Sequence, residues 1–466
     1  MDEMQIETLR AQVRGIVLAA GEPGWELALE TLLWNGRKPA RRPAAIVRAA
    51  DVEDVRHAVR YAAANGLTVS PRGAGHNWSG AAQQAGVVID LAGLDEIRVD
   101  AAAMTAEVGP GATNRALVAA LEPHGLGFPV GHCGSVPMSG YLLGGGIGWN
   151  AGRWGVACMR VESVEVVTAD GALLTASAER NADLFWAARG AGPLFFGVVV
   201  GYRLRLAPAP RAIRTGVWTW PLEAHEDVAA WMQATMAWAP ASVEFTAKFC
   251  AAPPPLALVS AKVVMAIATV FEDAAEAGDA ILARIGAAAP AGALEAQVGL
   301  PTPIPALYDL IDAGFPRGRR MAVDAMWSDA APSALFGAIA RGVARAPDAE
   351  CFGLGVVRSP LAPVPPAGAA AFSMIGPVFG ALYAMWRDPS GDAAGRAWVR
   401  GVAREAAPAV KGVYVGEADL AAPGRLAQAW TPEALSRLAA LRARHDPRNR
   451  FRREFAEPGC EETAAA

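Results

Sequence analysis

The glycine-rich stretch 131–149, GHCGSVPMSGYLLGGGIGW, is the feature that most constrains how this chain can fold. So many glycines in one segment imply backbone that is pressed against a flat or charged ligand. A dinucleotide-binding fingerprint needs glycines at its first, third and sixth positions, and counting from Gly144 the sixth position is Trp149. No Walker-type lysine accompanies these glycines. The stretch therefore predicts a cofactor-binding loop that is not of the Rossmann type.

A second glycine cluster, PRGAGHNWSG at 71–80, directly follows a predicted strand. Closely spaced glycines let successive backbone N–H groups converge into an anion-binding nest, which suits a pyrophosphate. His76 lies inside this turn, as Cys133 lies inside the longer stretch. Taken singly, His76 is equally compatible with an ordinary glycine-rich hairpin, and Cys133 with a small buried apolar residue. On the residues alone both interpretations stay open.

Five motifs along the chain, taken in order, are typical of one family. They are the two glycine clusters, GVVIDL at 86–91, DLFWAARGAG at 183–192 and DPRNRF at 446–451. This pattern resembles the berberine-bridge-enzyme-like branch of the vanillyl-alcohol-oxidase (PCMH-type FAD-binding) flavoprotein superfamily. The resemblance covers nearly the whole chain and implies an FAD-dependent oxidoreductase.

The resemblance also implies an α+β fold. A PCMH-type FAD-binding domain of two α/β subdomains is expected, together with an α+β substrate domain in which helices cover an antiparallel sheet. Combined with the change in composition near residue 211, it predicts an N-terminal helical segment (1–35), an FAD-binding domain (36–210), a substrate-binding domain (211–410), a C-terminal segment that returns to the FAD domain (411–456) and a disordered tail (457–466).

Local patterns predict individual elements within these domains. Ile6, Leu9, Val13 and Val17 follow helical spacing, which predicts a helix over the N-terminal segment. Asp51 suits the N-cap of a helix over residues 52–65 that ends at Gly66. Strands are predicted at 67–70, 87–91, 105–108 and 161–168, and in the substrate domain at 217–220, 243–249, 258–270, 351–357 and 373–383.

The resemblance assigns cofactor roles residue by residue. His76 matches the histidine that bonds the flavin 8α-methyl group, and Cys133 matches the cysteine that bonds C6, so FAD is expected to be held by two covalent links. Val136 matches a position that influences oxygen access, where valine is typical of an oxidase. Val198 is expected to contact the adenine side, and Asn449 to help close the pocket. The residues expected to line the pyrophosphate and the ring system are Arg72, Gly73, Ala74, Gly75, His76, Asn77, Gly134, Ser135, Gly140, Gly144 and Gly145.

The family chemistry is hydride transfer from an alcohol or amine carbon to flavin N5 while a base removes the heteroatom proton. Where the family often has Asn and Tyr on a flavin-facing strand, this chain has Gly416 and Glu417, so the catalytic candidates are Tyr414 and Glu417. Burial beside the flavin would raise the pKa of Glu417 enough for it to act as the base. The alternatives are a solvated strand residue for Glu417 and a packing role for Tyr414.

These expectations describe an oxidase that acts on an oligosaccharide or a secondary metabolite and passes electrons to O2, giving H2O2. The alternatives are a dehydrogenase that uses another acceptor and a flavin- or ligand-binding protein that has lost catalysis. Tryptophans of the middle domain offer stacking surfaces for a substrate, although core packing accounts for most such residues; they are Trp218, Trp220, Trp231, Trp238, Trp327 and Trp386.

Charge and cysteine usage limit the partners. Lys plus Arg total 42 against 46 for Asp plus Glu, a net charge of −4, which gives no electrostatic reason to expect nucleic acid or an anionic membrane. No secretory signal is visible, and the five cysteines show no metal-type spacing, so we expect a cytoplasmic monomer or homodimer without metal. Its expected partners are a small-molecule substrate and molecular oxygen. The uncharged stretch between Arg358 and Arg387 contains several prolines, which favours a loop entering a buried strand over a membrane span.

Overall fold

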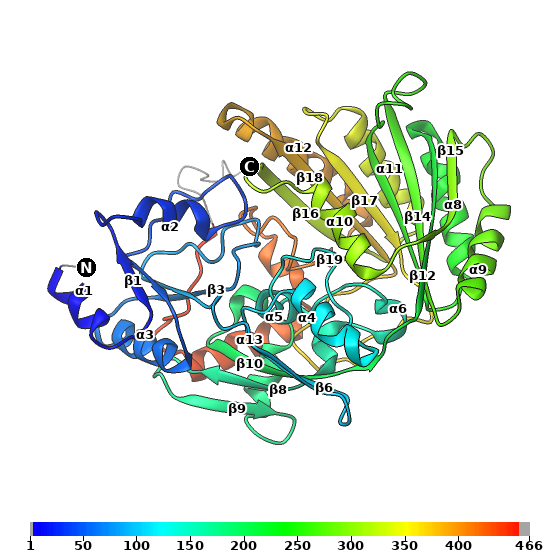
Figure 1. Cartoon of the computed structure of the whole chain (residues 1–466). Coiled ribbons are helices and arrows are strands. Elements are labelled where there is room, and N and C mark those ends of the chain that lie inside the picture. Colours follow the sequence, from blue (N-terminus) through cyan, green and yellow to red (C-terminus); the bar gives the residue numbers. More distant parts are fainter. Residues whose placement is uncertain (1–2, 456–466) are drawn as a thin grey trace.

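The computed structural model describes residues 3–455, and Figure 1 shows a lobe with two sheets beside a lobe with one large sheet. The first sheet is four-stranded, in the order β1-β2-β4-β3. β2, β4 and β3 run parallel, and β1 is antiparallel to β2. These strands are β1 (Ile16–Ala19), β2 (Ala45–Arg48), β3 (Val69–Arg72) and β4 (Val87–Asp90).

Alternating side chains let this sheet be covered on both faces. Val47 and Ile89 pack against α3 (Val52–Ala64), whereas Ile46 and Val88 pack against α2 (Trp25–Leu32). The predicted start of α3 is confirmed, because the Asp51 side chain accepts a hydrogen bond from the Asp54 amide. The predicted end is confirmed as well, since Gly66 follows the helix with a φ of +67°.

The N-terminal segment is not one helix as predicted. Val17 lies on β1 rather than on a helical face, because the chain turns sharply at Gly15. A Cβ on Gly15 would lie 2.0 Å from the Arg48 carbonyl oxygen, so only glycine fits there. The amides of Arg14 and Gly15 both donate to the Asp54 carboxylate. These contacts outweigh the helical spacing and divide the segment into α1 (Glu3–Arg10), β1 and α2.

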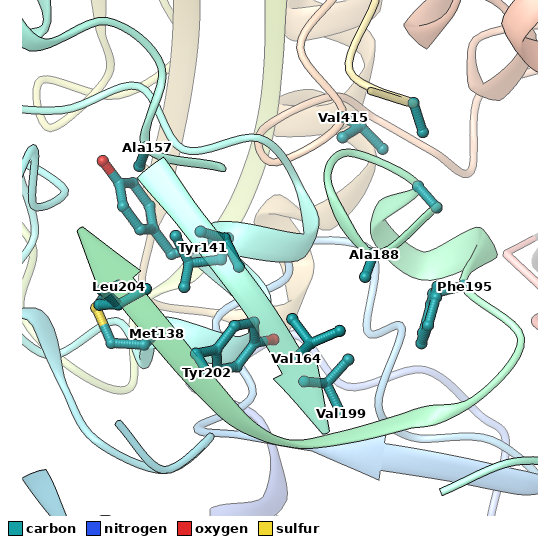
Figure 2. Packing of buried hydrophobic residues seen from close by; sticks show 14 of the residues in the cluster. Met138, Tyr141, Ala157, Val164, Ala188, Phe195, Val199, Tyr202, Leu204 and Val415 are labelled. Carbon is teal, nitrogen blue, oxygen red and sulfur yellow. The ribbon is translucent and has the colours of Figure 1, made fainter. Parts of the chain in front are cut away.

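The second sheet is five-stranded and antiparallel, in the order β5-β6-β10-β8-β9. Figure 2 shows its core, where Val164, Val199 and Leu204 from β8 and β10 pack with Tyr141 and Tyr202. The strands are β5 (Ile97–Asp100), β6 (Thr105–Val108), β8 (Val161–Val167), β9 (Leu173–Ser177) and β10 (Val198–Arg205). The helices of this subdomain are α4 (Asn114–Leu121), α5 (Met138–Leu143), α6 (Ala151–Trp154) and α7 (Ala182–Ala188), and a short ladder joins β7 (Leu126–Gly127) to β11 (Ala207–Pro208).

The third sheet is eight-stranded and antiparallel throughout, in the order β15-β12-β14-β13-β17-β18-β16-β19. The α+β fold class is confirmed, since helices bury one face of this sheet in a single apolar cluster. The strands are β12 (Ala212–Pro221), β13 (Val243–Ala251), β14 (Lys262–Glu272), β15 (Glu295–Pro301), β16 (Arg320–Ser328), β17 (Phe352–Val357), β18 (Val378–Trp386) and β19 (Gly412–Val413). The covering helices are α8 (His225–Met236), α9 (Ala275–Ala287), α11 (Pro332–Ala344) and α12 (Asp392–Ala406), while α10 (Ile304–Gly314) lies against α4.

The tryptophans of this domain are mostly core residues. Trp218, Trp220, Trp231 and Trp386 are buried in the cluster beneath the helices. Trp327 is buried on the opposite face, and Trp238 is partly buried with the Arg284 guanidinium 3.7 Å from its ring. They therefore stabilise the sheet and do not form an open stacking surface for a sugar.

Two strands of this domain start later than predicted. β14 begins at Lys262 rather than at Leu258, which is 94% exposed at the tip of a proline-rich loop. β18 begins at Val378 rather than Ser373. The uncharged stretch after Arg358 forms a loop that leads into this buried strand, as predicted. Within residues 3–455 no helix is long and apolar enough to cross a membrane. β15 and β16 were not predicted from the sequence. β16 contains a buried carboxylate, Asp324, which forms an ion pair with Arg425.

The C-terminal segment links the two lobes. β19 extends the large sheet through β16, and the chain then turns at Tyr414, whose carbonyl accepts the amides of Glu417 and Ala418. Residues 414–419 are therefore a turn rather than a flavin-facing strand. α13 (Pro432–His445) packs on the core of Figure 2, and the Arg450 carbonyl accepts the Val69 amide at 2.7 Å. The predicted tail, 457–466, lies outside the described residues.

Candidate active site

The first glycine cluster forms the loop after β3, and its arginine shapes the loop. The Arg72 guanidinium donates to Asp90 Oδ1 at 2.9 Å and to the carbonyls of Leu32, Gly73 and Ala74. A Cβ on Gly75, which has a φ of +73°, would lie 2.1 Å from the Leu32 oxygen. These contacts present His76, whose ring stacks on Trp34 at a centroid distance of 5.3 Å.

The cysteine loop is held by the start of α4. The Asn114 side chain donates to the Val136 carbonyl at 2.8 Å and accepts the Gly131 amide at 2.9 Å. The Arg115 amide donates to the Gly134 carbonyl at 2.9 Å. The loop is thus held on both sides of Cys133 by the Asn114 side chain and the Arg115 amide, so the thiol has a defined position.

The two loops bring the predicted histidine and cysteine together. Ser135 Oγ lies 3.2 Å from His76 Nε2 and 3.4 Å from Cys133 Sγ. The histidine loop packs closely against side chains that follow Cys133, since a Cβ on Gly73 would lie 2.7 Å from both Pro137 Cγ and Ser139 Oγ. An imidazole and a thiol that are 57 positions apart in the sequence therefore meet at one hydroxyl group.

The surroundings determine the charge states of this pair. Burial lowers the pKa of His76 to about 4, and the Arg72 and Arg317 charges act in the same direction. Burial also raises the pKa of the Cys133 thiol, against hydrogen bonds from Ser135 that favour the thiolate. At neutral pH the imidazole is therefore uncharged and keeps a free lone pair, and the thiol is protonated until a partner removes its proton.

The remaining residues that were predicted to bind the cofactor divide into two groups. Gly140 is exposed, and a Cβ added there would meet no atom within 4 Å. Ala74 and Asn77 are partly exposed, so backbone at these three positions is accessible to a ligand. Gly145 is instead closely packed, because a Cβ there would lie 2.2 Å from the Phe372 ring, whereas a Cβ on Gly144 would lie 3.3 Å from the Gly140 carbonyl oxygen. Packing alone thus explains the glycine at 145.

Two of the predicted residues lie apart from His76 and Cys133. Val198 starts β10 and is fully buried in the core of the first sheet. Asn449 is exposed, with a φ of +54°, in a turn where the amides of Arg450 and Phe451 donate to Asp446. A contact of either residue with the adenine or the pocket stays a prediction.

The second predicted pair lies where the C-terminal turn meets the large sheet. Tyr383 Oη on β18 donates to Glu417 Oε2 at 2.7 Å. Burial raises the pKa of Glu417, and the bond from Tyr383 and the charge of His132 offset only part of the rise. Burial likewise raises the pKa of Tyr414, so its phenol stays protonated. Glu417 is therefore the stronger candidate for a base.

An ion pair between His132 and Glu244 was not predicted from the sequence. His132 Nε2 lies 2.5 Å from Glu244 Oε1 on β13, and the imidazole sits 4.3 Å, centroid to centroid, from Trp149. Burial opposes the charge on His132, but Glu244 outweighs it and raises the pKa. The signal was present, because polar Glu244 alternates with apolar Val243 and Phe245. Its partner, however, lies 112 residues away.

Comparisons with known proteins agree with this arrangement. A family model described as an FAD binding domain matches residues 43–177. A FAD-linked oxidoreductase of Penicillium crustosum, penO, is 30% identical over 440 residues, covering 94% of this chain and 95% of the relative. The crystal structure of 6-hydroxy-D-nicotine oxidase from Arthrobacter nicotinovorans superposes with a TM-score of 0.82 at 23% identity, covering 95% of this chain and 97% of the other. A berberine-bridge-enzyme-like protein of Physcomitrella patens also gives 0.82, at 18% identity, covering 98% and 99%.

The fold and the matching FAD-binding domain define an FAD-dependent oxidoreductase. The chain belongs to the berberine-bridge-enzyme-like branch of the vanillyl-alcohol-oxidase flavoproteins, as the resemblance implied. The two glycine loops fit FAD, since they bring an imidazole and a thiol to one hydroxyl group, and Gly140 after the cysteine loop leaves open space where a Cβ would lie.

Proposed function

We propose that this protein is an oxidase that holds its FAD through two covalent bonds, from His76 and Cys133. The observation that carries the proposal is the meeting of both side chains at Ser135, 3.2 and 3.4 Å from its hydroxyl. A flavin ring has its two linkage carbons on adjacent parts of one edge, so both nucleophiles must approach the same edge. The uncharged state of His76 also supports bonding, because a protonated imidazole has no lone pair to give.

Glu417 acts as the base in this proposal, and Tyr383 positions it. Bound FAD supplies the hydride acceptor for the substrate carbon. Glu417 removes the proton of the substrate hydroxyl or amine, which its raised pKa makes favourable. Tyr383 donates to one oxygen of the carboxylate through its 2.7 Å bond, so it fixes the carboxylate orientation.

The substrate proposed is a small and largely apolar alcohol or amine. The face of the large sheet that meets the FAD-binding lobe carries Phe352, Leu354 and Phe379, and it packs with Trp34 and Trp78 from the other lobe. Leu354, Phe379, Trp34 and Trp78 are only partly buried, so apolar surface remains available there. This surface favours a secondary metabolite over an oligosaccharide.

Oxygen is the proposed electron acceptor, and peroxide the product. Val136 supports this choice, since its partly buried side chain lies three residues after Cys133, at the position where the family resemblance associates valine with oxidases. The competing function is a dehydrogenase with another acceptor. Photoreduced enzyme mixed with air separates the two: an oxidase regains its yellow colour within seconds and forms one H2O2 per flavin, whereas flavin that stays reduced in air and regains its colour only when an artificial electron acceptor is added supports the dehydrogenase.

Acid precipitation tests the covalent links. Flavin should stay in the pellet of the wild-type protein and of the single variants His76→Ala and Cys133→Ala, because each variant keeps one bond. The double variant should release all its FAD into the supernatant. Free FAD from the wild-type protein would refute covalent attachment while leaving the assignment to the flavoprotein family intact.

A further inference from the structure

One strand of the large sheet runs from the cysteine loop toward a lysine with no acidic partner. On β13, Phe245, Ala247 and Phe249 are fully buried beneath the helices. The alternate residues Glu244, Thr246 and Lys248 therefore share the opposite face, the one that meets the FAD-binding lobe. Their side chains are partly exposed there.

Lys248 lies among apolar neighbours. Its cross-strand partners are Met265 on β14 and Leu354 on β17. Its ammonium nitrogen is 4.9 Å from the centroid of the Phe352 ring, and within residues 3–455 no carboxylate lies within 4.0 Å of it. Within the described residues this half-buried cation therefore has an aromatic ring beside it but no anionic partner.

The same lysine is connected to the proposed reaction centre by stacked rings. Phe352 stacks on Tyr383 with 4.7 Å between centroids and 13° between planes, and Tyr383 donates to Glu417. At the other end of β13, Glu244 is held by His132, the residue before Cys133. Glu244 and Lys248 are four positions apart on the strand, roughly 13 Å.

We propose that Lys248 binds the anionic group, such as a carboxylate, of an elongated and otherwise apolar substrate. This inference rests on the proposed function, because it takes the surface beside Glu417 as the substrate site. The apolar body lies along Leu354, whose side chain is only partly buried, and the reacting carbon reaches toward Glu417. The ammonium then gains a charge-assisted hydrogen bond in surroundings where water competes poorly.

The test uses the flavin-loaded enzyme and two probes of equal length, 4-phenylbutyrate and 4-phenyl-1-butanol. Binding is followed by tryptophan fluorescence, which detects the bound probe whether or not the protein carries flavin, and by flavin absorbance. Wild-type protein should bind the carboxylate about ten- to a hundredfold more tightly than the alcohol. Lys248→Met should abolish this preference with little effect on the alcohol, and Lys248→Arg should keep it. Lys262→Met, on β14, is the matched control and should behave as wild type.

A wild-type protein without carboxylate preference, including one that binds neither probe, would overturn the inference. So would an equal preference in Lys248→Met, or loss of the preference in the Lys262 control. A preference that depends on Lys248 in a protein that carries no flavin would support the anion site while refuting the proposed function. The flavin absorbance of each sample separates these failures.

Discussion

Replacing Gly73 by alanine should move the two loops apart and selectively slow formation of the flavin bond to Cys133. The added Cβ would lie 2.7 Å from Pro137 Cγ and 2.7 Å from Ser139 Oγ. Nonbonded carbons prefer about 3.5–4.0 Å, so the cysteine loop must retreat by about 1 Å. A misplacement of about 1 Å can cost on the order of 100-fold in rate, so the Cys133 bond should form about 100-fold more slowly.

The bond from His76 should persist in this variant, because Trp34 and the Leu32 backbone hold the histidine loop independently. The assay is peptide mapping after acid denaturation: the flavin should remain on the His76 peptide, and Cys133 should react with iodoacetamide. Gly93→Ala is the control, since its Cβ would meet only one atom, at 3.5 Å. If Gly73→Ala forms the cysteine bond at the wild-type rate, the geometric reasoning is wrong.

Three further changes test other contacts. Tyr383→Phe removes a bond that favours ionised Glu417, so the pKa of Glu417 should rise and the acidic limb of flavin bleaching by an alcohol substrate should move up with it; an unmoved limb contradicts Glu417 as the base. Glu244→Gln should lower the stability of the protein most below about pH 6.5, because His132, whose pKa is raised, is charged there in the folded state. The loss of stability should shrink as the pH rises through the folded-state pKa of His132. A difference between the thermal melts of wild type and variant that does not change with pH would argue against the ion pair. Asp54→Ala orphans three backbone amides that donate to this carboxylate, which should cost about 3 kcal/mol or more in the free energy of unfolding by urea; a loss below about 1 kcal/mol contradicts the role.

Local signals in the sequence were sufficient where short-range chemistry decides the structure. Asp51 and Gly66 delimit α3 through one cap and one left-handed residue. The glycine clusters likewise predicted two ligand-binding loops, whereas the meeting of His76 and Cys133, which the structure shows, was implied by the family resemblance and not by a local signal. The cap and the glycine clusters depend on a few consecutive residues, so a sequence reveals them.

Long-range contacts decided what could not be predicted. Val17 has helical spacing with its neighbours, yet the fit of Gly15 against Arg48 places it on a strand. Glu417 gained its partner from β18, 34 residues away, and His132 gained Glu244 from another domain. No periodicity in the sequence reports which strand will face which loop.

Glu417 also shows how the surroundings of a residue determine its protonation state. As a residue of an exposed strand it would be ionised and inert, whereas the turn at Tyr414 places it against Tyr383 on the large sheet. Burial there raises its pKa, which is why we propose Glu417 as the base.

The central claim is that one flavin ring carries both bonds, and mass spectrometry of proteolysed wild-type protein tests it most directly. The account predicts a single species in which one flavin joins the peptide containing His76 to the peptide containing Cys133. Flavin bound to only one of these peptides, or unmodified forms of both peptides in a yellow protein, would contradict it.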